Sequence, residues 1–469
     1  MDYLTYYFRP IAEKNNMNYH FIAIGGAVMH NLALELHALG HAVTGSDDEI
    51  FEPAKSRLQS QGLLPDTMGW NPDNINPEID AIVLGMHAKS DNPELLKAQA
   101  LQIPIYSFPE FIYQQSKEKI RLVIAGSHGK TTSTGMLMHV LKNCGKNFDY
   151  LVGSIIPGYD RMVRISDAPI MVIEGDEYLT SPLDLRPKFV HYKAHAAMIT
   201  GIAWDHVNVF PTEPLYQDQF RILLESMDSH SPKVVWFQGD DDLKAIVEAS
   251  NVSAESYREP VYEPNESGVM LTQDTQGITL RLQLPFFGKH NLQNAAGVVK
   301  MANILGISEE DAWTALSTFP GTAKRMEIVA KTENLTIIRD FAHAPSKVAA
   351  TVQAVREQFP THRFISVFEV HTFSSLNPTF MQRYHETLSP ADEAFILFDP
   401  HVFALKKMPV PSASEIETRF GVGKALDSSQ ELKNFILTSI QANAQKQHVL
   451  LLMSSGNLGG LSASDFLPQ

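Results

Sequence analysis

The residues best suited to chemistry form a glycine-rich run that follows an apolar segment. Residues 120–125 are typical of a buried strand, and a stretch of helical periodicity follows the run and ends near Gly145. Glycines between a strand and a helix let successive N–H groups point inward, and the helix N-terminus adds partial positive charge. A lysine there can reach nucleotide phosphates, and a threonine hydroxyl can bind Mg²⁺. The run predicts a phosphate loop made of Gly126, Ser127, His128, Gly129, Lys130, Thr131 and Thr132.

The spacing of this loop departs from the standard pattern, which would place a glycine where this chain has Ile124. Taken alone, Gly-x-x-Gly-Lys-Thr is also compatible with an ordinary glycine turn. The flanking strand and helix favour phosphate binding.

Two further side chains end or follow apolar runs of the same region. Glu174 ends the run 170–173, and His206 follows the run 196–200. Ligands and metals gather at the carboxyl ends of parallel strands, so Thr131, Glu174 and His206 are predicted to bind Mg²⁺. The alternatives are an exposed loop carboxylate for Glu174 and a hydrogen-bonded core histidine for His206.

The elements that must position these residues alternate between strand and helix. At 469 residues, the chain is long enough for about three domains. The alternation predicts an α/β fold with largely parallel sheets and helices on both faces. We expect a Rossmann-like domain at 1–116, a central phosphate-loop ATPase domain at 117–321 and a second Rossmann-like domain at 322–469. Expected strands are 19–24, 41–44, 81–84, 103–106, 120–125, 169–173, 196–200, 335–338, 364–368, 394–398 and 449–453, with an antiparallel strand at 278–284; expected helices include 28–39, one from the phosphate loop to about 143, and 346–358.

Composition excludes several classes of protein. Acidic residues outnumber basic ones, 53 to 38, which argues against binding nucleic acid. A single cysteine, Cys144, cannot form an internal disulfide and fits a reducing compartment. No apolar run approaches the roughly 20 residues that span a bilayer, and the N-terminus lacks a signal-type apolar core. We therefore expect a cytoplasmic protein without membrane insertion, in which residues 1–16 form a short extension.

In chain order, the motifs resemble those of the Mur ligases. The glycine run resembles their ATP loop, Glu174 their Mg²⁺-binding glutamate, and Asp205-His206 the pair whose histidine binds a second Mg²⁺. The segment 287–295 resembles the helix start that approaches the nucleotide base, and 321–327 resembles the arginine signature. Asp340-Phe-Ala-His-Ala-Pro resembles the segment that contacts the ribose and the phosphates. The resemblance assigns ATP binding to His290, Asn291, Asn294, Arg325, Asp340 and His343 in addition to the loop.

The resemblance implies ligation through an acyl phosphate. The γ-phosphoryl group of ATP passes to a substrate carboxylate, an amine attacks, and phosphate leaves. Positioning and charge neutralisation do most of the work in such transfers. The residues implied as catalytic are Lys130, Glu174, His206 and Arg325.

The resemblance implies that the first domain binds a UDP-sugar. Gly25-Gly26 follows a strand, Ser46-Asp47 closes the next one, and the acidic residue lies about 20 positions after the glycines, as in dinucleotide sites. The segment 87–94, with His87 and Asn92, resembles family members that accept UDP-N-acetylmuramate directly. An NAD-dependent oxidoreductase is an alternative reading of this βαβ unit, but the third glycine of that fingerprint is missing. A non-enzymatic nucleotide switch is a second alternative, which the ordered motifs disfavour.

The acceptor is indicated by a second resemblance. The segments 174–178 and 184–192 are similar to family members that recycle peptidoglycan by joining UDP-N-acetylmuramate to the tripeptide L-alanyl-γ-D-glutamyl-meso-diaminopimelate. The alternative acceptor is free L-alanine. Arg186, Lys193 and residues 371–375 are candidates to contact the peptide. Two positions depart from the family: Arg221 stands where later ligases carry a carbamoylated lysine, and Ala344 replaces a second histidine.

Overall fold

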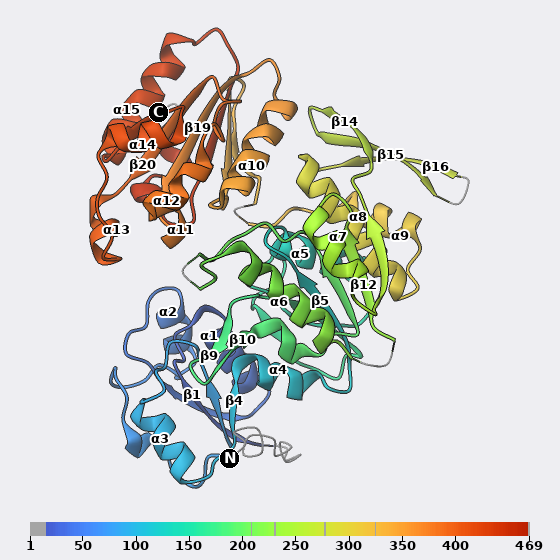
Figure 1. Ribbon diagram of the computed structural model, residues 1–469, viewed down its shortest axis with the longest axis vertical. Coiled ribbons are helices and arrows are strands. Elements are labelled where there is room, and N and C mark those ends of the chain that lie inside the picture. Colours follow the sequence, from blue (N-terminus) through green and yellow to red (C-terminus); the bar gives the residue numbers. More distant parts are fainter. Residues whose placement is uncertain (1–15, 208, 229–230, 276–277, 324, 468–469) are drawn as a thin grey trace. The chain divides into compact units, whose positions relative to one another are not determined.

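The computed structural model describes residues 16–207, 209–228, 231–275, 278–323 and 325–467 (Figure 1). Most of the expected N-terminal extension therefore lies outside the described residues. The chain divides into two compact units. One reaches to Gly126 and includes Leu141–Thr200 and Asp218–Ser256, and the second holds Ser127–Val140, Gly201–Gln217 and the chain from Tyr257 onward. No described helix is both long and apolar enough to cross a membrane.

The N-terminal sheet has four parallel strands in the order β2-β1-β3-β4. Its inner strand β3 (Ala81–Leu84) is buried at every residue, which explains its unbroken apolar run. Ile22, Leu84 and Leu95 are among the residues that form the core. The other elements are β1 (Asn18–Ile22), α1 (Ala27–Ala38), β2 (Ala42–Ser46), α2 (Ala54–Ser60), a 3₁₀ turn (Pro72–Asn74), α3 (Pro93–Ala100), β4 (Ile105–Ser107) and α4 (Phe108–Ser116).

The central sheet has seven strands in the order β13-β12-β11-β5-β8-β6-β7. Strand β5 (Ile120–Ala125) lies in its middle and pairs in parallel with β8 (Ile170–Glu174) and β11 (Ala196–Ile199). Because these strands run the same way, Gly126, Glu174 and Thr200 share one edge of the sheet. The other strands are β6 (Asp149–Leu151), β7 (Val163–Arg164), β12 (Lys233–Phe237) and β13 (Ser253–Tyr257).

Further helices and two small sheets come from residues 130–316 of the chain. Strands β9 (Leu179–Ser181) and β10 (Asp184–Pro187) form a hairpin. Strand β16 (Ile278–Leu284) pairs antiparallel with β15, so the expected antiparallel strand is confirmed. The remaining elements are α5 (Lys130–Asn143), a 3₁₀ turn (Lys188–Tyr192), α6 (Glu213–Ser226), α7 (Asp241–Glu248), β14 (Val261–Asn265), β15 (Gly268–Thr275), α8 (Lys289–Ile304) and α9 (Glu309–Leu316).

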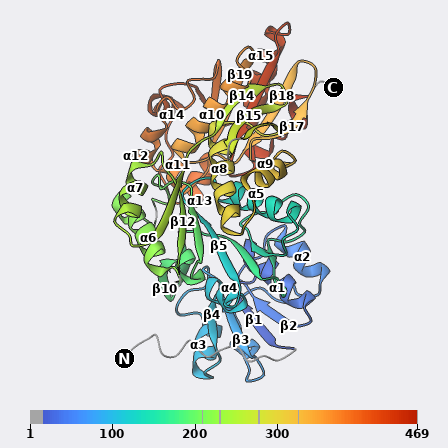
Figure 2. The same cartoon turned by 90° about the vertical axis from the view of Figure 1, so that its right-hand side faces the viewer.

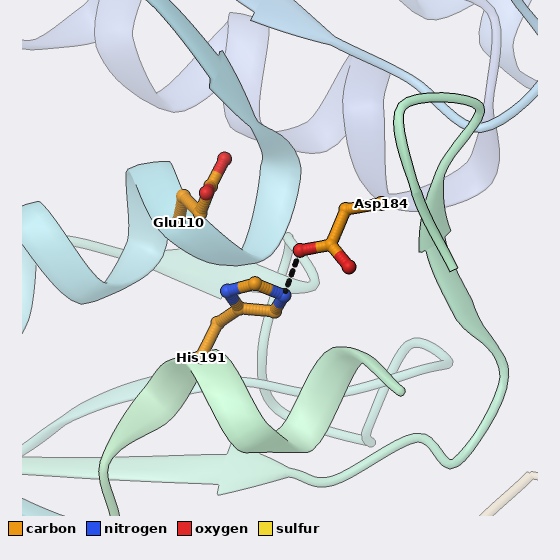
Figure 3. A group of neighbouring side chains, drawn as sticks. All are labelled: Glu110, Asp184 and His191. Atoms are coloured by element: carbon orange, nitrogen blue, oxygen red, sulfur yellow. Dashed lines mark ion pairs between the residues drawn. The ribbon is translucent and has the colours of Figure 1, made fainter. Parts of the chain in front are cut away.

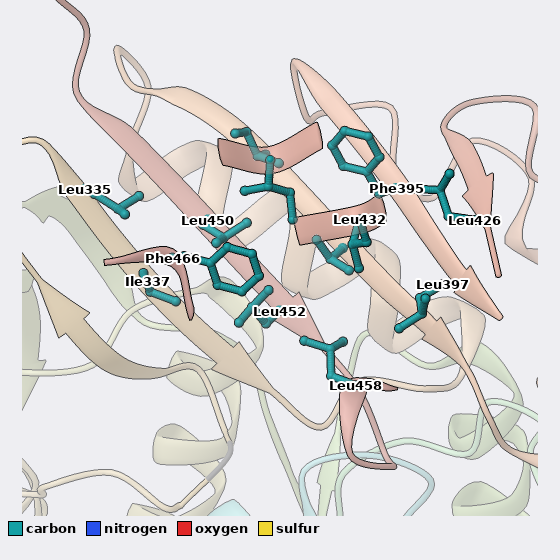
Figure 4. Packing of buried hydrophobic residues seen from close by; sticks show 13 residues of the cluster. Leu335, Ile337, Phe395, Leu397, Leu426, Leu432, Leu450, Leu452, Leu458 and Phe466 are labelled. Atoms are coloured by element: carbon teal, nitrogen blue, oxygen red, sulfur yellow. The ribbon is translucent and has the colours of Figure 1, made fainter. Parts of the chain in front are cut away.

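The C-terminal sheet has six strands in the order β17-β18-β22-β19-β20-β21, all parallel except the edge strand β17. Alternate residues of neighbouring strands share one face: Ile337 and Ile365 both pair with Leu450. This face packs against α15 (Ser429–Ala442), through Leu432 and Ile436, in the core drawn in Figure 4. Helix α10 (Pro345–Gln358) lies beside the strands in both views (Figures 1 and 2) and contacts β22.

This sheet is built from β17 (Glu327–Lys331), β18 (Leu335–Asp340), β19 (Arg363–Val370), β20 (Glu393–Phe398), β21 (Lys424–Leu426) and β22 (His448–Met453). Its helices are α10 (Pro345–Gln358), α11 (Phe373–Leu376), α12 (Pro378–Met381), α13 (Pro400–Leu405), α14 (Ala413–Phe420) and α15 (Ser429–Ala442), with 3₁₀ turns at Gln382–Tyr384, Leu458–Gly460 and Ala463–Phe466. The structure thus confirms an α/β fold, with three mainly parallel sheets that follow one another along the chain.

Candidate active site

The predicted phosphate loop has the expected local structure. Strand β5 ends at Ala125, Gly126 has φ +126° and Gly129 has φ +82°, and α5 begins at Lys130. Both values lie where glycine is favoured over other residues. The N–H of Ser127 donates to the carbonyl of Gly201 (2.9 Å), which holds one side of the loop. The backbone therefore turns sharply from a buried strand into a helix N-terminus.

Asn294 of α8 packs directly against this loop. A Cβ atom built on Gly129 would lie 2.4 Å from Asn294 Oδ1, so only a glycine fits there without displacing the amide. Asn294 and its neighbour Asn291 are both buried, and Asn291 Nδ2 donates to the carbonyl of Phe287 (2.9 Å). The structure thus brings the start of α8 to the phosphate loop, as the motifs predict for a nucleotide site.

Three histidines predicted to bind ATP are held neutral. Burial lowers the pKa of His128 to about 3, and it lowers the pKa of His290 and of His343 to about 4. His128 Nε2 and Ser346 Oγ are hydrogen-bonded at 2.7 Å, which ties the phosphate loop to the start of α10. At neutral pH these imidazoles act as hydrogen-bonding groups and carry no charge.

Asp340 organises the segment that carries Arg325. Its buried carboxylate accepts hydrogen bonds from the N–H groups of Met326 and Ala342, each at 2.7 Å. The Arg325 guanidinium lies over the ring of Phe341, 4.8 Å from its centroid, in cation–π geometry. Asp340 therefore fixes the backbone beside Arg325, and its contact with a ribose stays a prediction.

Asp205 is buried, and the next residue, His206, is half-buried. The Asp205 carboxylate accepts the N–H of His206 (2.7 Å) and lies 3.9 Å from His343 Nε2. Burial alone would raise the pKa of Asp205, but His206, His343 and His128 outweigh it and hold the pKa below its usual value. His206 has φ +54°, in the left-handed region that non-glycine residues adopt uncommonly.

One charged residue at this site was not predicted from the sequence. Lys347, in the first turn of α10, has a pKa lowered to about 7, because burial and the charges of Arg325 and Lys130 outweigh the attraction of Asp340 and Asp205. One feature of the sequence could have pointed to Lys347: it lies in the first turn of a helix, where the positive end of the helix dipole disfavours a lysine. We refer to Lys130, Arg325 and Lys347 as the cation cluster.

The side chains predicted to bind Mg²⁺ carry the kinds of ligand atom that a hard cation accepts. Glu174 ends β8 and its Oε2 accepts the N–H of Gly153 (2.7 Å), while Thr131 is buried in the first turn of α5. Carboxylate and hydroxyl oxygens and a histidine nitrogen suit Mg²⁺ when phosphates and water complete its shell. Thr131 and His206 belong to one compact unit and Glu174 to the other, so one Mg²⁺ at Thr131 and Glu174 and a second at His206 stay predictions.

In the N-terminal sheet, the glycine turn after β1 is held by Asp47. The N–H of Gly25 donates to Asp47 Oδ2 (2.7 Å), and a Cβ atom on Gly25 would approach the same oxygen to 2.9 Å. Burial raises the pKa of Asp47 to about 6. Gly26 directly precedes α1, and His87 is exposed in the turn after β3. These residues share the carboxyl edge of a parallel sheet, where ligands bind in such folds.

Two other residues predicted to bind the sugar nucleotide have structural partners. The Ser46 hydroxyl donates to Glu94 Oε1 (2.6 Å), and both side chains are buried. Asn92 caps α3 by accepting the N–H groups of Glu94 and Leu95 (2.9 and 3.1 Å). Both residues thus stabilise this edge of the sheet, and their contact with a ligand stays a prediction.

Arg186, a candidate for the acceptor peptide, is paired within its own hairpin. Its guanidinium donates to Asp184 (2.7 Å), and Asp184 also lies 3.2 Å from His191 Nε2 (Figure 3). Burial would raise the pKa of Asp184, but the bonds to His191 and Arg186 lower it well below its usual value. Glu110 lies beside this pair, where its carboxylate caps α4 through Ser107 (2.8 Å). The arginine already neutralises Asp184, which disfavours a metal ion here.

The other acceptor candidates lie in two loops. Lys193 is exposed and has a left-handed backbone (φ +45°). Residues 371–375 follow β19, where Thr372 caps α11 and the N–H of His371 donates to Ser375 Oγ (3.1 Å). Arg221, the position compared with a carbamoylated lysine, is exposed and forms an ion pair with Asp218.

Family profiles match almost the whole chain. Residues 18–119 match the "Mur ligase family, catalytic domain", residues 124–302 the "Mur ligase middle domain", and residues 324–456 the "Mur ligase, glutamate ligase domain".

The chain is similar to named ligases over most of its length. It is 26% identical to the Escherichia coli UDP-N-acetylmuramate–L-alanyl-γ-D-glutamyl-meso-2,6-diaminoheptandioate ligase, over 95% of this chain and 96% of that protein. It is 31% identical to a Streptococcus pyogenes UDP-N-acetylmuramate–L-alanine ligase, over 81% of this chain and 82% of that protein. A solved structure of the tripeptide-adding type from Neisseria is 28% identical, with a TM-score of 0.57 over 65% of this chain and 98% of that one.

Proposed function

The chain belongs to the Mur ligase family, and from this premise we propose that it is an ATP-dependent ligase for a preformed peptide. It joins the carboxylate of UDP-N-acetylmuramate to the amine of L-alanyl-γ-D-glutamyl-meso-diaminopimelate. This reaction returns a recovered cell-wall peptide to the peptidoglycan precursor pool in the cytoplasm.

The chemistry assigns roles to the residues of the second unit. The sugar carboxylate attacks the γ-phosphorus of ATP, the bond to the β-phosphate oxygen breaks, and ADP leaves. The tripeptide amine then attacks the acyl phosphate, and inorganic phosphate departs with the bonding electrons. Lys130 and Arg325 neutralise the transferred group, while Asn294 and His290 approach the nucleotide base beside the loop.

Thr131 and Glu174 would hold one Mg²⁺ ion and His206 a second, and these ions would supply further charge neutralisation to the phosphates. The Asp205 carboxylate orients His206 through its backbone N–H. The glycine turn at Gly25 and Gly26, shaped by Asp47, would receive the diphosphate of the UDP-sugar.

The choice of the tripeptide rests on the segment from Glu174 to Tyr192. Its Glu174-Gly-Asp-Glu-Tyr178 run and the hairpin with Asp184 and Arg186 resemble the tripeptide-adding members. The Escherichia coli relative of that type also matches 95% of the chain. Free L-alanine is the second candidate acceptor, favoured by the higher identity, 31%, to an alanine-adding relative over a shorter stretch.

An omission experiment tests the proposed reaction. Phosphate release from ATP is measured with UDP-N-acetylmuramate alone, with tripeptide alone and with both, and the product mass is determined. We expect release above background only with both substrates, together with a product of the summed mass less one water. Release that ignores the sugar nucleotide would refute the proposal, and a requirement for nicotinamide would favour the oxidoreductase reading.

A further inference from the structure

We propose that Lys347 is a further catalytic residue of this chain, and that its ammonium group binds the γ-phosphoryl group of ATP together with Lys130 and Arg325. The inference deepens the proposed function, on which it rests for the identity of the transferred group. The Asp-Phe-Ala-His-Ala-Pro motif ends two residues before Lys347, so no motif pointed to it.

The position of Lys347 is defined by two contacts of its helix turn. Its Nζ lies 5.9 Å from the centroid of the Phe341 ring, and Arg325 Cζ lies 4.8 Å from the same centroid. The preceding residue, Ser346, is hydrogen-bonded to His128 of the phosphate loop at 2.7 Å. The first turn of α10 thus places Lys347 at the same aromatic ring as the predicted arginine, one residue after the serine that contacts the predicted loop.

Lys347 has no ion-pair partner in the part of the chain that the structure describes. No described carboxylate lies within 4.0 Å of its ammonium group. Asp205 and Asp340 attract the charge from farther away, but their carboxylates are already hydrogen-bonded to the backbone of His206, Met326 and Ala342. An ammonium in this setting lacks a neutralising neighbour.

Folding alone does not account for a lysine at this position. Burial and two neighbouring cations disfavour its charged form, and its lowered pKa reflects that cost. The first turn of a helix also favours acidic residues over basic ones. Residues that are unfavourable for the free protein but converge on one place are typical of ligand sites. A multiply charged anion would satisfy all three cations, and the triphosphate of ATP is such an anion.

The chemical role follows from the charge that moves during transfer. As the bond between the γ-phosphorus and the β-phosphate oxygen breaks, the electron pair leaves with ADP, and a new bond forms to the sugar carboxylate. Negative charge stays on the three equatorial oxygens of the phosphoryl group during its transfer. Lys347 donates hydrogen bonds to these oxygens and transfers no proton, so its contribution is electrostatic.

The test compares Lys347→Gln with Lys347→Arg. Lys331→Gln serves as the matched control, since it removes an exposed lysine from β17 at the edge of the same six-stranded sheet. Each variant is measured for kcat, for KM and for the Kd of ATP and of ADP by calorimetry. Far- and near-ultraviolet circular dichroism checks the fold.

We expect Lys347→Gln to lower kcat by about 10²- to 10³-fold, the usual effect of removing one donor to a developing charge. Lys347→Gln should also weaken ATP binding by about tenfold more than it weakens ADP binding. Lys347→Arg and Lys331→Gln should change kcat, and the ratio of the ATP to the ADP dissociation constant, by less than about tenfold. A folded Lys347→Gln variant with unchanged kcat and an unchanged ATP-to-ADP ratio would overturn the inference. If wild-type protein ligates neither acceptor, the proposed function fails, yet the ATP-to-ADP ratio still decides the role of Lys347.

Discussion

Replacing Gly129 by alanine would place one methyl group between the phosphate loop and α8. The residue has φ +82°, which costs alanine about 1–2 kcal/mol. The new Cβ would lie 2.4 Å from Asn294 Oδ1 and 3.0 Å from Asn294 Cγ, inside contact distance. Because Asn294 is buried, moving it adds about 1–3 kcal/mol of overpacking. The total is about 2–5 kcal/mol.

If the altered loop moves away from Asn294, the free energy of the clash is lost from nucleotide binding. If the loop keeps its position, the same free energy is lost from folding. At about 1.4 kcal/mol per tenfold change, a displaced loop would weaken ATP binding by about 30- to 4,000-fold. Calorimetry with ATP and urea unfolding of the free protein measure the two parts, and their sum should fall within the predicted range.

Gly158→Ala is the matched control. Gly158 has φ +84°, but a Cβ atom there would meet nothing within 4 Å. This variant should lose only the backbone contribution of about 1–2 kcal/mol in unfolding free energy, with unchanged ATP affinity. If Gly129→Ala keeps both its ATP affinity and its stability within about 0.5 kcal/mol of wild type, the packing described between Gly129 and Asn294 is wrong.

Three further predictions concern charge. Lys130→Ala should fold normally but lose at least about 10²-fold in ligation rate, and near-wild-type turnover would exclude this loop as the catalytic phosphate site. Ligation should require Mg²⁺, and His206→Ala should raise the Mg²⁺ concentration needed for half-maximal rate; an unchanged requirement would remove His206 from the metal. Because folding depresses the pKa of Asp184, its stabilisation is complete above a pH of about 4 and is lost as pH falls further. The difference in unfolding free energy between wild type and Asp184→Asn should therefore shrink below that pH, and a constant difference down to pH 2 would contradict this reasoning.

The elements that carry the site were predictable because burial determined their composition. Strands β3, β5 and β16 have the expected bounds, and β8 and β11 agree within one residue at each end, since continuous apolar runs and strict alternation leave little ambiguity. The hairpin of β9 and β10 was missed, because these short strands carry no regular apolar pattern, and the buried residues of β9, Thr180 and Ser181, are polar. Strand propensity depends on context and says little for such short polar segments.

Long-range contacts were the least predictable part of the candidate site. The sequence indicated that the phosphate loop follows a strand, but it did not show that Asn294 packs on Gly129. A single lysine in a helix usually lies in solvent, so Lys347 became a candidate only when folding brought residues 325, 340–347 and the loop together. Ser46 was predicted to bind the sugar nucleotide, but its hydroxyl donates to Glu94, which lies 48 positions away in the chain.

The acceptor preference tests the proposed function most directly. It is measured as kcat/KM for the tripeptide and for L-alanine, each with saturating ATP, Mg²⁺ and UDP-N-acetylmuramate. We expect kcat/KM to be at least about 100-fold higher for the tripeptide, because a site built for several carboxylates and amides leaves polar groups unpaired when a small amino acid binds. A clear preference for L-alanine would contradict the proposal and identify the chain as the alanine-adding member of its family.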